Sequence, residues 1–329
     1  MENHKLQVAA SPHITSGAST RKIMLAVIVA LLPTLAATTM IFGLRALLLT
    51  AVTVAACVAF EALWCRLMKK PIPVGDLSAV VTGLILAFNL PPAFPLWMAV
   101  VGAFVSIVIT KQLFGGLGFN FANPALVGRI VMQLSFTGPM IDYTFPSTYG
   151  GVDALATATP LIVAKNQALP MIDMMLGTHG GVLGETCAVT LLLGGLFLIV
   201  TRVISAAIPL FYIGGVFLFK FFLNLGSGAS AAESAYESLT LVLAGGLLLG
   251  AFFMATDYVT SPYTLSGKVI FGLCLAVLTV SIREWATMPE GVSFSILLMN
   301  LLVPYINNLT RRRPMGVPKG RWKSGKGAA

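Results

Sequence analysis

The sequence predicts an all-α polytopic membrane protein with about ten transmembrane helices, and its composition is the first reason. Hydrophobic residues make up 57% of the 329 residues and charged residues only 10%, whereas a soluble domain carries about 25% charged residues. The mean hydropathy is +0.89. The second reason is the length of the apolar runs: runs of about 20 residues span a bilayer as helices, whereas barrel strands alternate and are about 10 residues long.

The apolar runs follow one another along the whole chain, and several are short for a hydrocarbon layer about 30 Å thick. We expect a helix in every run, because lipid cannot satisfy free backbone polar groups. The runs cover residues 23–43, 46–65, 77–90, 96–113, 124–136, 185–201, 204–223, 239–256, 268–283 and 292–309.

A faint internal symmetry is the third reason. The segments "GLILAFNLPPAFPLW" (83–97) and "GAFFMATDYVTSPYTLSG" (250–267) each end an apolar run with a small polar residue, Asn89 or Asp257, which proline then follows. Helix breaks of this kind are tolerated at membrane depth only where protein or a cavity satisfies the freed backbone groups.

Each of these segments is followed by a Gly- or Pro-broken opening to another span, "FGGLGFNFANPALVGRIVM" (114–132) or "EWATMPEGVSFSILLMN" (284–300). Five predicted spans precede the long loop and five follow it, so the second half runs opposite to the first. Such patterns are typical of folds that bind a ligand near the membrane midplane. We therefore predict two inverted five-helix repeats with broken helices near the midplane.

These patterns divide the chain into five parts. They are a cytoplasmic N-terminal segment (1–22), a first membrane repeat (23–136), an extracytoplasmic loop (137–184), a second membrane repeat (185–310) and a basic cytoplasmic tail (311–329). The loop is too long for a simple connection, and loops of more than about 15 residues are usually functional or disordered. Its aromatic and aliphatic content argues against disorder.

The charge distribution orients the predicted spans, because basic residues favour the cytoplasmic side. The basic residues expected inside are Arg21, Lys22, Arg66, Lys69, Lys70, Lys111, Arg202 and Lys268, together with those of the tail. The acidic loop 227–238 contains no Lys or Arg and is expected outside. Both termini are therefore predicted to be cytoplasmic. The polar stretch before the first apolar run does not resemble a signal peptide.

The net charge of +9 does not indicate nucleic-acid binding, because the basic residues lie at span ends and in the tails. The four cysteines, Cys57, Cys65, Cys187 and Cys274, form no CxxC pair, so this chain alone predicts neither a zinc nor an iron–sulfur site. We interpret them as small buried hydrophobic residues.

The stretch "GVDALATATPL" (151–161) combines Asp153 with Thr157 and Thr159 in a long loop. A threonine hydroxyl is a poor nucleophile without an activating base, so a self-contained hydrolase is not expected. Two interpretations remain. One is an ordinary capped turn, in which Asp and Thr satisfy loose N–H groups at a helix start. The other is an acceptor site, where small neighbouring residues leave a hydroxyl open to a modifying enzyme.

The stretch resembles the flavin-attachment motif of the family that contains the D subunit of Rnf electron-transport complexes and the B subunit of the sodium-pumping NADH:quinone oxidoreductase. In that motif an aspartate precedes a Ser or Thr, and an Ala-Thr pair ends it. The matching residues here are Asp153, Ala158 and Thr159, whereas Ala156 stands at the Ser/Thr position and Thr157 follows it. Thr159 is the expected acceptor, and Thr157 remains the alternative.

Segments elsewhere in the chain carry the same resemblance. They are "SPHITSGASTRKIML" (11–25), "FGGLGFNFANPALVGR" (114–129), "MATDYVTSPYTLSGKVIFG" (254–272) and "EGVSFSILLMNLLVPYI" (290–306). The resemblance implies FMN joined through its phosphate to Thr159 by a flavin transferase, and a second, noncovalent flavin, riboflavin, in the membrane part. It further implies a bacterial inner-membrane complex that moves electrons between ferredoxin and NAD and transports Na⁺ or H⁺. A second covalent-flavin subunit and iron–sulfur subunits would be partners.

Polar residues in or beside the apolar runs are the remaining candidates. Asn120, Asn123 and Arg129 are predicted to contribute to cofactor binding, and Asp257 to hold a cation or receive a proton. The sequence places no complete catalytic site in this chain. A helix-end cap is the alternative for Asp257, and snorkelling to the interface is the alternative for Arg129 and for Lys220.

Two further interpretations bear on function. Glu61 and Arg66 are interpreted as an intrahelical pair. The glycines of "GGLGF" (115–119) are not taken as a dinucleotide-binding motif, because no βαβ unit surrounds them.

The competing function is a stand-alone transporter or channel without flavin, built on the same inverted repeats.

Overall fold

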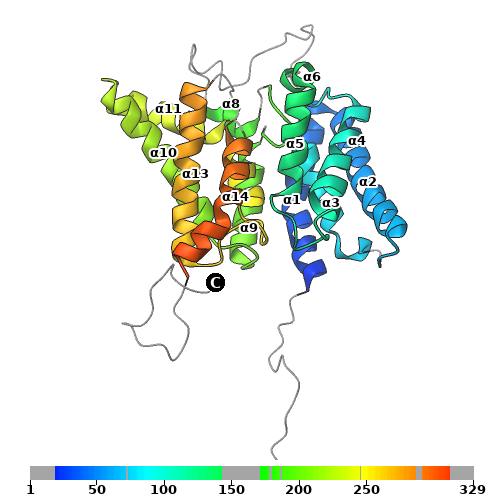
Figure 1. Ribbon diagram of the computed structural model, residues 1–329. Coiled ribbons are helices and arrows are strands. Elements are labelled where there is room, and N and C mark those ends of the chain that lie inside the picture. The colour runs from blue at the N-terminus through cyan, green and yellow to red at the C-terminus, as the bar shows by residue number, and fades with distance from the viewer. Residues whose placement is uncertain are drawn as a thin grey trace, which may run out of the picture.

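The computed structural model describes residues 19–71, 73–142, 171–177, 180–185, 187–244, 246–286 and 291–311. Within these residues the chain is helical and contains no strand. The longer helices run roughly side by side as a bundle (Figure 1). The all-α prediction is therefore confirmed for the described part of the chain.

The helices of the N-terminal half are α1 (Thr20–Phe42), α2 (Leu44–Leu67), η1 (Val74–Asp76), α3 (Ser78–Phe88), α4 (Leu96–Phe104), η2 (Val105–Gln112), α5 (Pro124–Ser135) and α6 (Thr137–Ile141). Those of the C-terminal half are α8 (Met171–Leu176), α9 (Ala188–Val200), α10 (Ala207–Gly226), α11 (Ala231–Leu243), α12 (Leu247–Leu249), η3 (Gly250–Met254), α13 (Leu265–Trp285) and α14 (Val292–Leu309). η2 and η3 are π-helical segments that continue α4 and α12.

Helices occupy each of the ten predicted apolar runs, but they differ in length. Among the described residues, five helices are long and apolar enough to cross a membrane, namely α1, α2, α10, α13 and α14. The pair formed by α11 and the α12–η3 segment, bent by 63°, makes a sixth candidate. The shorter apolar helices span Ser78–Phe88, Leu96–Gln112 and Ala188–Val200. The chain is therefore a multi-pass membrane protein, and the count of ten crossings remains a prediction.

Local sequence signals set the helix boundaries. The Ser19 hydroxyl accepts a hydrogen bond from the backbone N–H of Lys22 (3.3 Å) and caps α1. The Asn123 carboxamide caps α5, which begins with Pro124. A side-chain oxygen before the first turn satisfies an N–H group that has no partner within the helix. Gly43, at φ +76°, joins α1 to α2 in a conformation that only glycine adopts readily.

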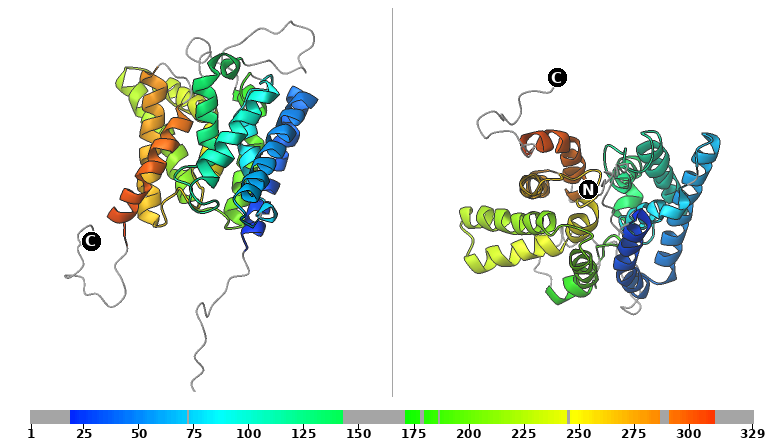
Figure 2. Two further views of the ribbon diagram at one scale, coloured as in Figure 1. Left: turned by 45° about the vertical axis from the view of Figure 1, so that its right-hand side comes forward. Right: turned by 90° about the horizontal axis from the view of Figure 1, so that it is seen from below.

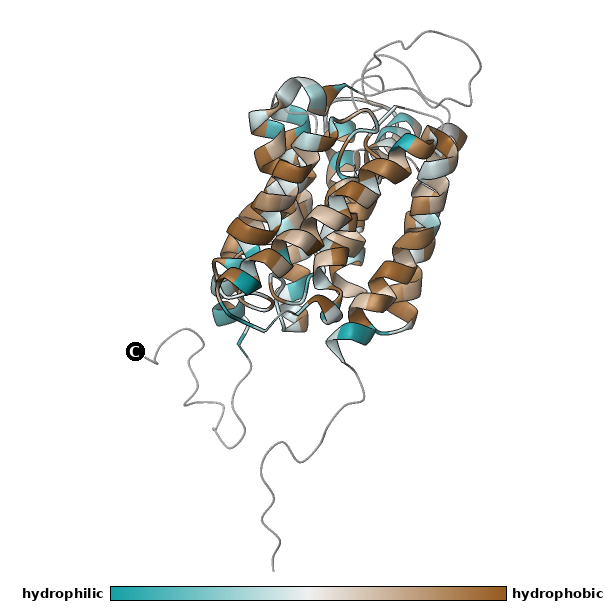
Figure 3. Ribbon diagram, turned by 90° about the vertical axis from the view of Figure 1, so that its right-hand side faces the viewer, coloured by the Kyte–Doolittle hydropathy of each residue, from teal (hydrophilic) through white to brown (hydrophobic). Residues whose placement is uncertain are grey.

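The two halves of the chain form two groups of helices that lie next to one another (Figure 2). The groups meet where α1 packs on α9 and where α5 packs on α14. Figure 3 shows apolar residues along the helix shafts and hydrophilic residues gathered toward the two ends. This distribution is the one expected of helices that cross a hydrocarbon layer.

The positions of the helix ends define two faces of the molecule. α1 begins and α14 ends at the same face, whereas α6 and α8 lie at the opposite face (Figure 1). The connection between α6 and α8 contains residues 143–170, which lie outside the described residues. We call the face where α1 begins the α1 face, and the opposite one the α6 face.

The predicted helix break after α3 is confirmed, and protein groups satisfy its free carbonyls. The backbone N–H of Gly184 donates to the carbonyl of Phe88 (2.7 Å), and that of Leu183 donates to the carbonyl of Leu90 (3.1 Å). A Cβ added at Gly184 would lie 2.7 Å from the Cβ of Phe88. Only glycine therefore lets the backbone at residue 184 come this close to the end of α3. Broken backbone is tolerated at this depth because another segment completes its hydrogen bonds.

The second break lies between α11 and α12. Gly246 has a φ of +62°. Arg283, which is buried on α13, donates through Nη1 to the carbonyl of Leu241 (2.6 Å) and through Nη2 to the carbonyl of Ala244 (3.1 Å). A cationic side chain at a helix C-terminus satisfies open carbonyls and opposes the negative end of the helix dipole.

Candidate functional site

A cavity of about 90 Å³ lies near the α1 face, between elements of both halves. Its walls come from α1, α3, α5, α9, η2, η3 and the segments that follow α9, η2 and η3. Apolar residues form most of the lining: Ile23, Met24, Val27, Val81, Ile85, Leu117, Pro124, Leu198, Val203, Ile204, Phe252, Phe253 and Val259. The polar or aromatic-polar residues are Ser78, Thr82, Lys111, Asn120, Asn123, Thr256, Asp257 and Tyr258. Mostly apolar concavities with a few convergent polar groups are the usual sites for cofactors.

Asn120 and Asp257, which are 137 positions apart in the printed sequence, meet at this cavity. The side chain of Asn120 hydrogen-bonds the Asp257 carboxylate, which also accepts from backbone groups of Tyr258 and Val259. The hydroxyl of Thr260 donates to Oδ2 of Asp257 at 3.0 Å. Two predicted site residues from different halves are thus held in one network.

Asp257 lies in the loop after η3, outside the helical spans. Burial raises the pKa of its carboxyl above the ordinary value, because loss of water disfavours the charged form. The hydrogen bonds from Thr260, Asn120 and the backbone act in the opposite direction, because they stabilise the carboxylate. The carboxylate has more hydrogen-bond partners than a simple helix cap requires, and its role in holding a cation or receiving a proton stays a prediction.

Asn123 joins the two halves at the edge of the cavity. Its Oδ1 accepts from the backbone N–H of Ala125 (3.1 Å), and its Nδ2 donates to the carbonyl of Met254 at the end of η3 (3.3 Å). The amide of Asn300 on α14, oriented to match its neighbours, accepts from the backbone N–H of Asn123 (3.2 Å) and donates to the carbonyl of Thr260 (3.0 Å). The predicted non-helical opening before α5 is confirmed, and Asn123 is central to it.

Arg129 does not line the cavity. It is 2% exposed on α5, and its Nη1 donates to Oδ1 of Asn89 (2.8 Å) and to Oγ of Ser293 (2.8 Å). The snorkelling interpretation is wrong for this residue, because the guanidinium is enclosed by protein. Arg129 instead ties the end of α3 and the start of α14 to α5.

Lys220 is not free at an interface either. Its ammonium lies 2.7 Å from a carboxylate oxygen of Glu284 and 3.7 Å from one of Glu237. This group connects α10, α13 and α11 through charged contacts. The ion pairs, rather than snorkelling alone, account for the position of Lys220.

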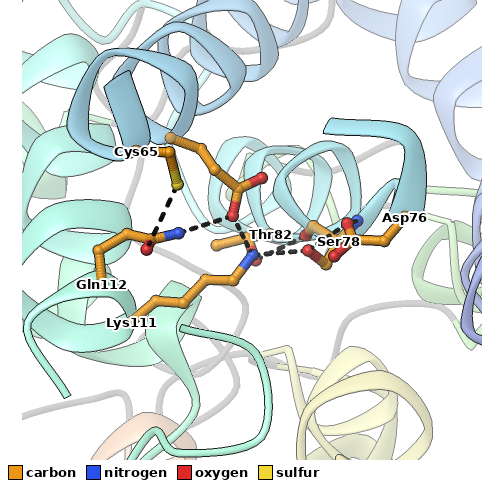
Figure 4. Close-up of polar contacts among 7 residues, drawn as sticks. Cys65, Asp76, Ser78, Thr82, Lys111 and Gln112 are labelled. Atoms are coloured by element: carbon orange, nitrogen blue, oxygen red, sulfur yellow. Dashed lines mark hydrogen bonds and ion pairs between the residues drawn. The ribbon is translucent and has the colours of Figure 1, made fainter. Parts of the chain in front are cut away.

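The interpretation of Glu61 and Arg66 as an intrahelical pair is wrong. Glu61 is 0% exposed, and its Oε1 lies 2.6 Å from the ammonium of Lys111 on η2 (Figure 4). Arg66 is exposed. Sequence reasoning missed this pair because its partners are 50 residues apart, although a lysine within an apolar run was a signal of a buried partner.

The predicted flavin-attachment residues Asp153, Thr157, Ala158 and Thr159 lie outside the described residues. The helices on either side of them, α6 and α8, lie at the α6 face, away from the cavity. Among the cysteines, Cys57, Cys65 and Cys187 are buried, as interpreted, whereas Cys274 is exposed.

These features define a multi-pass helical membrane protein whose two helix groups line a mostly apolar cavity, with a few polar side chains, near one face. The sequence of residues 7–316 matches the model of the NQR2, RnfD, RnfE family. The chain is 43% identical over 326 residues to the D subunit of the Na(+)-translocating ferredoxin:NAD(+) oxidoreductase complex of Acetobacterium woodii, and the match covers 97% of this chain and 98% of the relative.

Other relatives match over a similar length. The chain is 38% identical to the D subunit of the proton-translocating ferredoxin:NAD(+) oxidoreductase complex of Clostridium ljungdahlii, over 92% of this chain and 94% of the relative. It is 37% identical to the D subunit of the ion-translocating oxidoreductase complex of Stutzerimonas stutzeri, over 91% of this chain and 92% of the relative. The chain therefore belongs to the NQR2, RnfD, RnfE family.

Proposed function

We propose that this chain is the membrane-embedded D subunit of an ion-translocating ferredoxin:NAD oxidoreductase complex and relays electrons through bound flavin. The observation that carries the proposal is similarity along nearly the full length to subunits with that name. The motif agreement in four separated segments supports the same assignment. The chain is then one subunit of an oxidoreductase and has no complete active site of its own.

The first flavin in this proposal is FMN, joined by a phosphoester to Thr159. The motif "DALATATP" supports it, with Asp153 and the Ala158-Thr159 pair at the matching positions. α6 and α8, which flank the motif, lie at the face opposite the start of α1. A covalent link would keep the cofactor on a loop that faces water. Flavin supplies one- and two-electron transfer, and the protein tunes its potential through nearby charge and hydrogen bonds.

The second flavin is noncovalent and occupies the cavity near the α1 face. The donor set fits such a group: the carboxamides of Asn120 and Asn123 and the carboxylate of Asp257 offer donors and acceptors to a polar ring edge, and apolar residues cover the ring faces. Of the described residues that line the cavity, Lys111 alone has a cationic side chain, and it is paired with Glu61. A flavin without phosphate, such as riboflavin, suits this lining better than a phosphorylated one.

The membrane arrangement in this proposal has ten crossings in two inverted five-helix repeats. The helices in all ten predicted runs support it. Both termini lie in the cytoplasm and the flavin loop lies outside the bacterial inner membrane, an orientation supported by the basic residues near the α1 face. Electrons would then pass between the cavity near the inner face and Thr159 at the outer face.

The partners in this proposal are the other membrane and peripheral subunits of an Rnf-type complex. Iron–sulfur subunits and a second covalent-flavin subunit carry the chemistry for which this sequence offers no CxxC pair and no nucleotide fold. A flavin transferase attaches the FMN during maturation. No nucleic acid is involved.

In-gel flavin fluorescence after SDS denaturation tests the covalent flavin. Wild type, Thr159→Ala and Thr157→Ala are each expressed with a flavin transferase. We expect a fluorescent band in wild type and in Thr157→Ala, and none in Thr159→Ala. A band lost only in Thr157→Ala would move the site. A fluorescence-free wild type that carries no flavin after purification would instead favour a stand-alone transporter or channel.

A further inference from the structure

The buried pair Glu61–Lys111 belongs to a longer chain of hydrogen bonds that the proposed electron relay does not use. Glu61 is on α2, Ser78 begins α3, and Lys111 is on η2. The ammonium of Lys111 donates to Oε1 of Glu61 (2.6 Å) and to Oγ of Ser78 (2.6 Å). Three elements thus meet through one cationic group near the α1 face (Figure 4).

The pair is enclosed by protein. Glu61 is 0% exposed and Lys111 is 2% exposed. Oε1 of Glu61 also accepts from the side-chain amide of Gln112 (2.9 Å), whereas Oε2 is buried without a hydrogen-bond partner in the described part of the chain. An ionised carboxylate has about four acceptor sites, so this one retains unused hydrogen-bond acceptor capacity.

Ser78 connects this pair to a second carboxylate. Its hydroxyl lies 2.6 Å from Oδ1 of Asp76, which also accepts from the backbone N–H of Ser78 (2.8 Å). An ammonium has donors only, and a hydroxyl has one donor and two acceptor lone pairs. Because Lys111 must donate to Ser78, the Ser78 proton must point to Asp76. The direction of every bond from Lys111 to Asp76 follows from this chemistry.

The two ends of the chain of hydrogen bonds have different surroundings. Asp76 is half-buried in η1, at the α1 face. Ser78 and Lys111 line the cavity. The hydrogen bonds therefore run from a group that reaches the α1 face to an ammonium at the wall of the candidate cofactor site.

The local backbone supports this placement of Lys111. η2 is π-helical, with i to i−5 bonds that continue past its end, such as the one from the N–H of Gly116 to the carbonyl of Lys111 (2.9 Å). π-Helical turns inside helices occur frequently at functional sites. Here η2 brings the adjacent Lys111 and Gln112 to the same carboxylate oxygen.

We propose that Asp76, Ser78 and Lys111 form a proton relay between the α1 face and the cavity, with Glu61 as the buried counter-ion of Lys111. In the outward step, Lys111 Nζ gives a proton to Ser78 Oγ while the hydroxyl proton of Ser78 passes to Asp76 Oδ1. Lys111 becomes a neutral amine and Asp76 a carboxylic acid, which then loses its proton to water. The reverse sequence returns a proton to Lys111.

The ligand of this site is a proton rather than a metal cation. The ammonium occupies the space between the oxygens of Glu61 and Ser78, and a second cation there would meet like-charge repulsion. Other titratable groups around the pair are Cys57 and Cys65 on α2 and Lys70 before η1. None of these bridges Lys111 to Asp76 in the described hydrogen-bond network.

The relay gives the cavity a charge that can change. Lys111 is cationic when loaded and neutral after the outward step, so its field at the cavity wall favours or disfavours negative charge there. This role rests on the proposed electron relay, in which an added electron would be balanced by a proton at Lys111. The proton path itself rests on the hydrogen bonds alone.

A pH jump followed by infrared spectroscopy tests the path on the purified full chain in lipid nanodiscs. An alkaline jump drives the outward step of the proposed relay, and the carboxylate stretch of Glu61 reports the change in its partner; Glu61→Gln identifies that band. We expect Ser78→Ala to slow the response by about 100-fold, which is the usual scale for loss of a proton-transfer group. Ser78→Thr retains a hydroxyl and is expected to respond as wild type does.

The matched control is Ser238→Ala, because Ser238 is a buried helical serine on α11 whose hydroxyl donates to the carbonyl of Ser234 (2.6 Å). It should respond at the wild-type rate. A wild-type rate in Ser78→Ala would overturn the relay, and so would equal slowing in Ser78→Ala and Ser78→Thr. Acid precipitation of the same samples releases noncovalent flavin into solution, and visible absorbance of the supernatant reports it separately from FMN joined to the chain. Absence of flavin would refute the proposed cofactor and leave the result for the proton path unchanged.

Discussion

Replacement of Lys111 by methionine tests how the protein stabilises charge between its helices. The variant removes the ammonium that lies 2.6 Å from Oε1 of Glu61, and Glu61 keeps one donor, the Gln112 amide at 2.9 Å. Loss of one partner leaves a charge buried without compensation, which costs about 3–5 kcal/mol of the free energy of unfolding. We expect a loss of this size, because Glu61 is 0% exposed.

The double variant Glu61→Gln/Lys111→Met separates the charge from the packing. It removes both charges and keeps side chains of similar length, so most of the lost stability should return. Lys220→Met is the matched control, because the Lys220–Glu284 pair is partly exposed, at 12% and 24% for the two side chains. A partly exposed ion pair contributes about 1 kcal/mol or less to the free energy of unfolding.

Equilibrium unfolding in mixed micelles of SDS and a mild detergent measures these differences on the full chain. We expect the free energy of unfolding to fall most in Lys111→Met, less in the double variant and least in Lys220→Met. Equal losses in Lys111→Met and Lys220→Met would refute the claim that burial determines the cost. A double variant no more stable than Lys111→Met would show that packing, rather than the unpaired carboxylate, causes the loss.

Two further predictions concern the helix break and the cavity. Gly184→Ala should lower the free energy of unfolding by about 1–3 kcal/mol, because its Cβ would lie 2.7 Å from that of Phe88; Gly138→Ala, with open space around its Cβ, is the control in the same unfolding assay. The raised pKa of Asp257 means that folding favours its protonated form. Its stabilising contribution is therefore present below the unfolded pKa and is lost as the pH rises through the folded pKa. Unfolding curves across that range should show this loss in wild type and not in Asp257→Asn, and identical pH dependence in both would contradict the assignment.

Much of the helical structure could be predicted because its signals are local. Apolar runs predicted the positions of the helices, and α3 ends at Phe88 just where Asn89 and two prolines follow. The cap of α5 at Asn123, directly before Pro124, is a local feature of the same kind, although Asn123 was predicted only as a cofactor-binding residue. Hydrophobicity, proline and capping residues act over one or two helical turns, so one sequence suffices to read them.

The candidate site was predictable in part. Asn120, Asn123 and Asp257 were recognised as polar residues beside apolar runs, and the structure brings all three to one cavity. Arg129 was recognised in the same way but lies elsewhere, bound to Asn89 and Ser293. A polar residue in an apolar run predicts that some partner exists. It does not identify that partner, because local sequence signals do not say which helices pack against each other.

The sequence by itself determined the class of protein, the positions of its helices and the family motifs, including the stretch around Thr159 that the described residues do not contain. Only the tertiary structure decided that Glu61 pairs with Lys111 rather than with Arg66, and that Ser78 links this pair to Asp76. The physical reason is range: helix formation follows from neighbours in sequence, whereas a buried charge is stabilised by whichever group the packing of distant helices brings within hydrogen-bond distance.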